Sequence, residues 1–395
     1  MNKRPLSYRA LFAVVYTTSV SSVYFALGVV AHRANGLTPL VFLAAGVFFL
    51  LTAMTFGEAS SLHQERGGSA VFARYAFNEL VSFVAGWAIV LDYTILIAVT
   101  ALTVPAYLAA FWGQIDHGVL EIVVAFGVIL FVLVDNVMGV SSRRLRRRVA
   151  ITLGDLVLQA LVIVLGVVLA FHPERLSQTI HLGTAPKLSD LAFALPIAII
   201  AFTGLEAGAS VAGEVADTGR SIKRMVLSGS TAIVLIYVGI SLVGVMALPV
   251  HNGVTALGQT NIKAPVLGVV EALRPKWISD VLKYLVAIGG ALGLAAAANS
   301  AMLGVSRVGY SLATNRQIPS AVGRLHPRWG TPFVIMGAAA IAAAALVLPT
   351  DLELLVGIYA FGALLSFTIA HLSVIVLRFR EPDRPRNYSI ALSVP

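Results

Sequence analysis

Residues 11–31 read LFAVVYTTSVSSVYFALGVVA, an apolar run of membrane-spanning length that hydroxyl groups interrupt. About 20 helical residues, rising 1.5 Å each, cross the roughly 30 Å of hydrocarbon in a bilayer. Five hydroxyl residues nonetheless fall within six positions, from Thr17 to Ser22. Single hydroxyls in such helices usually bond their own backbone, whereas five together favour an unwound stretch. The segment predicts a first transmembrane helix that is broken around Ser19–Gly28.

Runs of similar length recur along all 395 residues, of which 58% are hydrophobic and 12% charged. An ordinary soluble domain has about 25% charged residues, so a soluble core cannot absorb this much apolar surface. Mean hydropathy is +0.88. We count ten runs, at residues 11–31, 39–59, 81–111, 120–140, 149–171, 191–213, 226–250, 278–313, 333–348 and 352–377. They predict an all-α integral membrane protein with ten transmembrane helices.

The positions of the basic residues predict the orientation of this protein in the membrane. The chain has 28 Lys and Arg against 19 Asp and Glu. If the N-terminus is cytoplasmic and the runs alternate, 21 of the 28 basic residues lie inside, five of them between 143 and 148. Cytoplasmic loops carry such an excess. We therefore expect a multi-pass protein of the cytoplasmic (inner) membrane, surrounded by lipid, with both termini cytoplasmic and no nucleic-acid partner.

A second interrupted helix is expected in the sixth run, where residues 201–214 read AFTGLEAGASVAGE. Thr203, Glu206 and Ser210 follow helical spacing, and the small residues among them make a break easy. The first and sixth runs open two halves of five helices. Interrupted helices in matching positions indicate the binding site of transporters built from inverted repeats. We predict repeats at residues 1–187 and 188–380, a cytoplasmic tail at 381–395, and breaks in helices 1 and 6.

Carboxylates inside the apolar runs are the next candidates. Asp92 and Tyr93 lie well inside the third run, with Thr100 on the face of Asp92. A carboxylate there costs about 2.5–3.5 kcal/mol, so it should face a cavity or a partner on another helix. Asp135 and Asp155 flank the arginines at 143–148. Pairing with these arginines is the simpler interpretation, although Asp155 could lie a turn or more further in.

Motifs of other protein classes are missing from the sequence. There is no cysteine, no H-E-x-x-H or other paired metal-ligand spacing, and no phosphate-binding loop. A passive channel should show a continuous polar stripe through several helices, whereas these polar residues cluster at two breaks. The pattern predicts a secondary transporter of small polar solutes that is not an enzyme, has no cofactor or metal, and uses a proton or cation gradient.

Three motifs resemble the amino acid–polyamine–organocation (APC) superfamily. Gly57-Glu58 precedes RGGSAVFARYAF at residues 66–77, FTGLE occupies residues 202–206, and a third motif extends from Ser306-Arg307 to Gly330-Thr331-Pro332. The resemblance covers nearly the whole chain. It implies the LeuT-type fold of five plus five inverted repeats, with substrate between broken helices 1 and 6. It also implies alternating access driven by a proton or sodium gradient.

The resemblance assigns roles to both breaks. Ser21, Ser22 and the backbone as far as Gly28 would meet a substrate carboxylate, and residues 203–206 would meet its ammonium group. Three features depart from the family pattern. The first helix has TSVSSVYF at residues 18–25 where amino acid members have a glycine-rich signature, Gly154-Asp155 stands where some proton-coupled members have a lysine, and the chain stops before an eleventh helix.

Bacterial potassium importers of the Kup type are a rival within the same fold. The potassium site that their resemblance implies would comprise Asp92, Tyr93, Thr203 and Glu206, although Thr18 stands where such importers have an aspartate. We favour proton-coupled uptake of an amino acid or related amine, with potassium import as the alternative.

The candidate residues follow from these arguments. The substrate-binding candidates are Ser19, Ser21, Ser22, Tyr24, Phe25, Gly28, Tyr93, Thr100, Thr203, Gly204 and Glu206. The coupling candidates are Asp92, Glu206 and Asp155, and we hypothesise that Asp92 or Glu206 carries the coupled proton.

Overall fold

A computed structural model of the whole chain describes residues 19–63, 68–139, 142–178, 180, 186–204, 230–251 and 254–384. This part of the chain is almost entirely helical. Its only strands are β1 (Val250–His251) and β2 (Val254–Thr255), which pair antiparallel. The predicted all-helical class is therefore confirmed.

The apolar runs form the long helices, because a helix satisfies every backbone group within itself where water is absent. Seven segments in the described ranges are long and apolar enough to cross a membrane. They are Val23–Ser60, α5 (Glu79–Leu108), α6 (Gly118–Val137), Ala150–Leu169 of α7 (Ser142–Leu169), α12 (Ser230–Ala247), α14 (Lys276–Thr314) and α16 (Leu352–Arg380). The first contains α2 (Val23–Ala34), η1 (Asn35–Leu37) and most of α3 (Thr38–Leu62). Shorter apolar helices are α9 (Leu188–Ala201) and α15 (Phe333–Val347). The count of ten remains a prediction.

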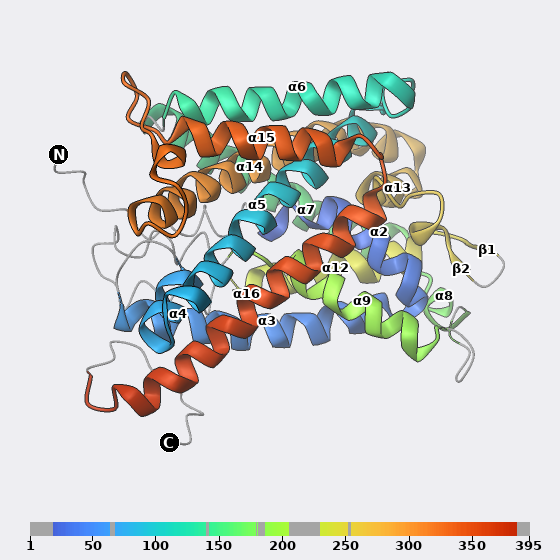
Figure 1. Cartoon of the computed structure of the whole chain (residues 1–395). Helices are drawn as coiled ribbons and strands as arrows, with labels where there is room; N and C mark the ends of the chain where they lie inside the picture. Colours follow the sequence, from blue (N-terminus) through green and yellow to red (C-terminus); the bar gives the residue numbers. More distant parts are fainter. Residues whose placement is uncertain are drawn as a thin grey trace.

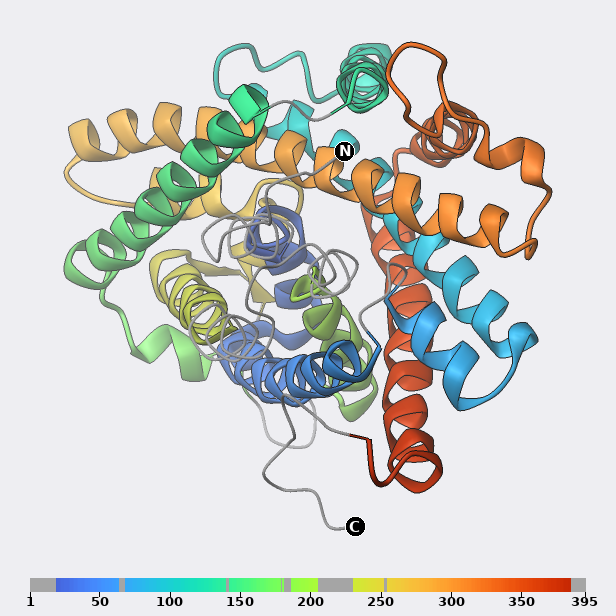
Figure 2. The same ribbon diagram turned by 90° about the vertical axis from the view of Figure 1, so that its left-hand side faces the viewer.

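Two groups of helices account for much of the packing, and α7 packs against a member of each, α12 and α14. In the first, α2 packs against α9, and α3 packs against both α9 and α12. In the second, α5 packs against α6, α14 and α15. The helix α16 touches α5 of one group and α3 and α9 of the other. Figure 2 shows α2, in dark blue, near the middle of the assembly, with α6 (teal) and α7 (green) at its edge. Apolar side chains of α6 and α7, such as Leu130, Val164 and Val168, are exposed, as expected of faces that meet lipid.

Short elements lie at the two ends of the assembly (Figure 1). One end, called here the α4 end, carries α4 (Ser69–Ala76) and η5 (Ser320–Gly323). The opposite α13 end carries α8 (Glu174–Gln178), β1, β2 and α13 (Pro265–Glu271). The segment between residues 251 and 276 thus contains the short helix α13. Together with η4 (Ala256–Gly258), this segment packs against α2.

Gly28 allows the chain before α13 to lie directly on α2. A Cβ at Gly28 would stand 2.2 Å from the carbonyl oxygen of Ile262. We expect Gly28→Ala to lower the free energy of unfolding by about 1–3 kcal/mol, because a rigid backbone group must move. The measurement is the unfolding temperature of the purified protein. Gly127→Ala on α6 is the matched control, since no atom lies within 4 Å of its new Cβ and alanine favours a helix by about 1 kcal/mol. Equal melting of both variants would contradict the prediction.

Candidate functional site

The first helix is interrupted at Ser21 and Ser22. Ser19 and Val20 are helical, Ser21 and Ser22 form a turn, and α2 begins at Val23. Short-range bonds mark the turn, with the Ser22 amide 3.3 Å from the Ser19 carbonyl oxygen. The break is narrower than expected, because the chain from Val23 through Gly28 is regular helix. Residues 11–18, with two of the five hydroxyls, lie outside the described residues.

The second expected break falls in the run where α9 ends at Ala201. Phe202, Thr203 and Gly204 are not helical, and Gly204 has φ +133°, a conformation that residues with a Cβ rarely adopt. Both breaks are buried, with Ser19 and Ser22 completely inaccessible and Thr203 2% exposed. Glu206 lies outside the described residues, as does the rest of 205–229.

The two breaks touch each other. The Ser19 hydroxyl donates to the Thr203 carbonyl oxygen at 2.8 Å. The Tyr237 hydroxyl of α12 lies 2.8 Å from the carbonyl oxygens of both Ser19 and Ala201. The Thr203 hydroxyl is hydrogen-bonded to the Tyr359 hydroxyl of α16. A helix end leaves carbonyl groups without intrahelical hydrogen-bond partners. Here the hydroxyls of Ser19 and Tyr237 are the partners of such carbonyl groups. Ser19 and Thr203, 184 positions apart in the sequence, are therefore in direct contact.

A buried carboxylate lies beside the first break. Asp155 of α7 accepts hydrogen bonds from the Tyr24 hydroxyl at 2.5 Å and from the Gln159 amide at 2.8 Å. The Tyr107 hydroxyl of α5 donates to the Tyr24 carbonyl oxygen at 2.8 Å. A Cβ at Gly293 of α14 would lie 3.5 Å from Ser21 Oγ and 3.6 Å from Asp155 Oδ1. Four helices thus converge at this point.

Among the described residues, Asp155 has partners other than the arginines at 143–148. Asp155 is 6% exposed, and its partners are Tyr24 and Gln159. Seven residues, about two turns, separate it from Arg148, which carries it deeper into the assembly. Asp135 accepts a hydrogen bond from the Asn299 amide of α14 at 2.8 Å. The side chains of 142–149 lie outside the described residues, so pairing of Asp135 with them stays a prediction.

Two buried polar atoms near this point have no hydrogen-bond partner among the described residues, Ser22 Oγ and Gln159 Oε1. Both side chains are completely inaccessible. Buried polar groups are normally paired with protein or with ordered water. Beside a break, the Ser22 hydroxyl can donate to or accept from a polar solute, and Gln159 Oε1 can accept from one.

The remaining candidates lie elsewhere. Asp92 is 3% exposed and faces α16, where a Cβ at Gly362 would lie 3.9 Å from Asp92 Cβ. Gly362 follows Tyr359 by about one helical turn of α16, and Tyr359 bonds Thr203. Asp92 therefore contacts α16 about one turn away from the point where Thr203 does. Tyr93 packs on Gly304 of α14. The Thr100 hydroxyl donates to the Leu96 carbonyl oxygen at 2.7 Å, within its own helix.

Phe25 and Gly28 do not face open space in the structure. Phe25 is completely buried in the apolar core, and Gly28 faces the Ile262 backbone. The polar residues that sequence reasoning missed are Tyr107, Gln159, Tyr237 and Tyr359. Of these, only Gln159 could have been found from the sequence, because it stands four residues after Asp155 and therefore lies on the same helical face.

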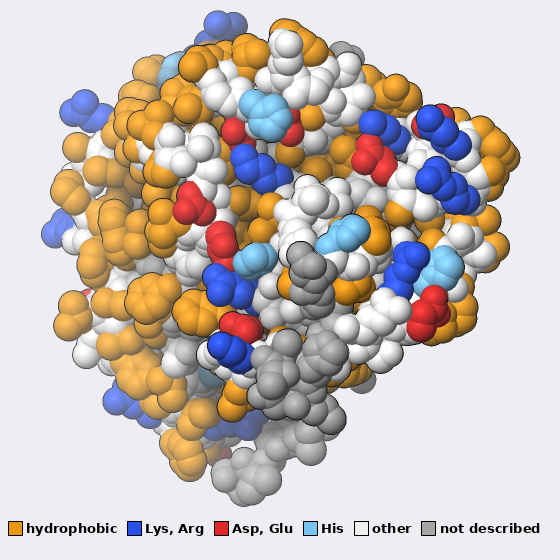
Figure 3. Space-filling view, turned by 90° about the vertical axis from the view of Figure 1, so that its right-hand side faces the viewer, with side chains coloured by type: hydrophobic (Ala, Val, Ile, Leu, Met, Phe, Trp, Pro, Cys, Tyr) orange, Lys and Arg blue, Asp and Glu red, His pale blue; other side chains and the backbone are white. Residues whose placement is uncertain are grey.

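A polar cavity opens at the α13 end, with a volume of about 400 Å³. Its charged and ionisable lining residues are Asp116, His117, Lys263, Glu271 and Lys283. Lys263 pairs with Glu121 of α6 at 2.6 Å, and Lys283 pairs with Glu271 at 2.7 Å. Ala106 of its lining precedes Tyr107, which bonds Tyr24. Figure 3 shows charged and histidine side chains on this end, with hydrophobic side chains around much of its rim.

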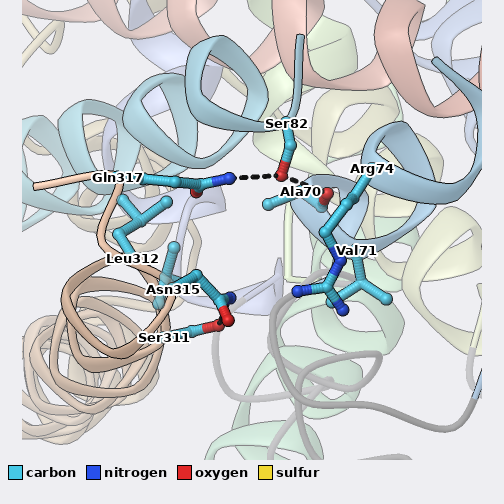
Figure 4. Close-up of a pocket in the computed structure, with 9 residues that line it drawn as sticks. Ala70, Val71, Arg74, Ser82, Ser311, Leu312, Asn315 and Gln317 are labelled. Atoms are coloured by element: carbon cyan, nitrogen blue, oxygen red, sulfur yellow. Dashed lines mark hydrogen bonds between the residues drawn. The ribbon is translucent and has the colours of Figure 1, made fainter. Parts of the chain in front are cut away.

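A much smaller cavity lies at the α4 end (Figure 4). Its volume is about 10 Å³, which is room for one water molecule at most. Gln317 donates to the Ser82 hydroxyl at 3.0 Å, and Ser82 donates to the Ala70 carbonyl oxygen at 2.9 Å. No group of three or more His, Cys, Asp or Glu residues that could hold a metal occurs in the described ranges.

Comparison of the sequence with known proteins identifies the family of this chain. The model of the amino acid permease family matches residues 6–394. A vacuolar cationic amino acid transporter of Arabidopsis thaliana is 27% identical over 96% of this chain and 60% of its own length. The branched-chain amino acid permease of Bacillus subtilis is 23% identical over 89% of this chain and 76% of its own length. An uncharacterized transporter of Mycobacterium tuberculosis is 26% identical over 93% of this chain and 78% of its own length.

These similarities give no support to the potassium alternative. The relatives that carry a substrate name transport amino acids, except for a methylthioribose transporter of Bacillus subtilis. A match over nearly all of the chain, joined to a multi-helical structure with apolar membrane-length helices, places it among transporters. The chain belongs to the amino acid permease family, within the APC superfamily that its three motifs resemble.

Proposed function

We propose that this protein takes up an amino acid or related amine across the cytoplasmic membrane, driven by protons, by alternating access. The observation that carries the proposal is the contact between the two helix breaks, where Ser19 bonds the Thr203 carbonyl oxygen in a buried position. Broken helices that meet inside the membrane offer backbone groups and hydroxyls to a polar solute. Residues 19–22 and 203–204 form the described part of this site, and Glu206 is its proposed further member.

The arrangement of the helices supports two five-helix repeats, 1–187 and 188–380. Four helices of the first half pack on their counterparts in the second, α2 on α9, α3 on α12, α5 on α14 and α6 on α15. Such pairing is expected when two similar halves are related by a pseudo-two-fold axis in the membrane plane. By the distribution of Lys and Arg, the α4 end faces the cytoplasm and the α13 end faces outward. The 400 Å³ cavity would then be the outer approach to the site.

The polar groups divide between the two ends of the substrate. The turn before α2 and the hydroxyls of Ser21 and Ser22 suit a carboxylate, because the N-terminal end of a helix attracts anions. The ammonium group is a hydrogen-bond donor and suits carbonyl oxygens at the end of α9, such as that of Thr203, which already accepts from Ser19. Tyr93, Thr100, Phe25 and Gly28 are not included, since their side chains or backbones are occupied by packing or by their own helix.

Asp155 is the coupling residue that the geometry supports best. Of the three candidates, Asp92 and Asp155 are described, and Asp155 bonds directly to Tyr24 of α2. A hydrogen bond to an ionised carboxylate is roughly twice as strong as one between neutral groups. Proton binding to Asp155 would therefore weaken the connection between α7 and the first break. This links protonation to movement of the helix that contacts the substrate.

The test is a stabilisation screen of the purified protein against amino acids, polyamines and alkali cations. A ligand that binds only the folded state at 100 times its Kd adds about 2.7 kcal/mol to the free energy of unfolding. We expect a raised unfolding temperature with one class of amino acid or amine, and a smaller rise for Ser19→Ala. Stabilisation by potassium or rubidium alone would refute the proposal. Uptake of the stabilising compound into proteoliposomes, driven by a pH gradient, completes the test.

A further inference from the structure

His371 of α16 lies against α3 with both ring nitrogens close to threonine hydroxyls. Nε2 is 3.1 Å from Thr52 Oγ1, and Nδ1 is 3.0 Å from Thr55 Oγ1. The imidazole is half-buried, and the Phe48 ring stands edge-on beside it at 6.1 Å between centroids. The proposed transport mechanism does not use this residue.

Each threonine hydroxyl has a second neighbour that determines where its hydrogen points. Thr52 donates to the Phe48 carbonyl oxygen at 3.0 Å, and Thr55 donates to the Leu51 carbonyl oxygen at 3.1 Å. A hydroxyl has one hydrogen, so a threonine that donates to its own helix can only accept from the ring. Both ring nitrogens must then carry a hydrogen. A neutral imidazole carries one and an imidazolium two, so only the charged ring satisfies all four contacts.

We propose that His371 is a proton-binding site that fastens α16 to α3. The protonated ring donates to Thr52 and Thr55 together, and charge-assisted hydrogen bonds of this kind are the stronger ones. After loss of the proton, one threonine must turn its hydrogen towards the bare nitrogen and give up its backbone bond. Because α16 also packs on α5, the site joins the two groups of helices in a proton-dependent way. The inference goes beyond the proposed function and does not depend on which solute is transported.

Few charged or ionisable groups belong to α16 or to the elements packed against it near His371. Within the described residues they are Glu58 and His63 on and after α3, Arg74 and Tyr75 on α4, Glu79, Asp92, Tyr93 and Tyr107 on α5, Asp190 on α9, and Glu353, Tyr359, Arg378 and Arg380 on α16. Glu58 follows Thr55 by one helical turn, and it is ion-paired with Arg378 at 2.6 Å. Asp92 lies near Gly362, more than two turns from His371. Counted along the helices, Glu58 is thus the carboxylate nearest to His371, and its charge is already balanced by Arg378.

The protonation state of this ring is measurable by NMR of protein labelled with ¹⁵N-histidine in lipid nanodiscs. The chain has eight histidines, and subtracting the spectrum of His371→Gln identifies the one in question. Between about pH 8 and about pH 5, we expect the ring to pass from one N–H to two. In the Thr52→Val/Thr55→Val variant, half-protonation should need about tenfold more protons, a shift of about one pH unit. Valine keeps the shape of threonine and removes only the hydroxyl.

Thr368→Val is the matched control. Thr368 lies on α16 and donates to the Leu364 carbonyl oxygen at 2.8 Å, like the other two threonines, but it is exposed. Its loss should leave the titration of His371 unchanged. A ring that keeps a single N–H down to about pH 5 in folded protein would overturn the proposal. The proposal would also be overturned if His371 in the Thr52→Val/Thr55→Val variant titrated at the same pH as in the wild type. If the double variant does not fold, Thr52→Val alone gives the same comparison. None of these readouts needs transport, so failure here is distinct from failure of the proposed function.

Discussion

Proton-driven uptake by the Asp155→Asn protein is expected to fall about tenfold to a hundredfold, while exchange of substrate across the membrane continues. The carboxylate accepts hydrogen bonds from Tyr24 and Gln159 at the first helix break. A hydrogen bond to a charged group is worth about 1.5–3 kcal/mol, which corresponds to this range of rates. Asparagine keeps the shape of the side chain but neither carries the charge nor binds the proton. Exchange needs only substrate binding and alternation, so it should survive.

Two assays on the same proteoliposomes separate these activities. One measures accumulation driven by an acidic exterior, and the other measures counterflow of labelled substrate without a gradient. Asp135→Asn is the matched control, because it removes another buried carboxylate that bonds Asn299, away from the break. Accumulation that remains as steeply dependent on the gradient as in the wild type would contradict the coupling role. Loss of both activities in intact protein would instead make Asp155 part of substrate binding.

The general architecture followed from local properties of the sequence. The length of apolar runs is fixed by the thickness of the bilayer, so the predicted helices recur in the structure. Clustered hydroxyls and glycines predicted interruptions, and the described chain turns at Ser21 and ends a helix at Ala201. Hydroxyl clusters, however, do not determine how long a break is. Thr100 shows the limit, because a threonine on the right face can still bond its own helix.

The contacts within the site could not be predicted from local sequence. Tyr24 and Asp155 are 131 positions apart, and Ser19 and Tyr237 are 218 apart. A single tyrosine in an apolar helix is typical of packing or of the membrane interface, so the roles of Tyr237 and Tyr359 had no local signal. Pairing with the arginine run was the simpler interpretation for Asp155 because their distance along the chain is short, although a deeper position was left open. Depth in the membrane, not sequence distance, decides which groups such a carboxylate meets.

Removal of the Arg378 side chain is expected to lower the free energy of unfolding by about 3–5 kcal/mol. Its guanidinium donates to both carboxylate oxygens of Glu58, at 2.8 and 2.6 Å, and joins α16 to α3. The Glu58 side chain is completely buried. Arg378→Ala therefore takes two charge-assisted hydrogen bonds from a carboxylate that water cannot reach in the folded state, which is far more costly than losing an exposed pair.

The loss of helical circular dichroism on heating, in one detergent, measures the effect. Arg384→Ala is the matched control, since Arg384 pairs with Glu381 at 2.9 Å with 43% of its own side chain exposed. An exposed pair contributes about 0–1 kcal/mol, so this variant should melt close to the wild type. Arg378→Ala/Glu58→Gln should regain much of the lost stability, because the neutral amide is easier to bury. Without that recovery, the cost would come from the packing of the arginine stem rather than from the buried charge. Equal melting of the two arginine variants would mean that the ion pair does not fasten α16 to α3.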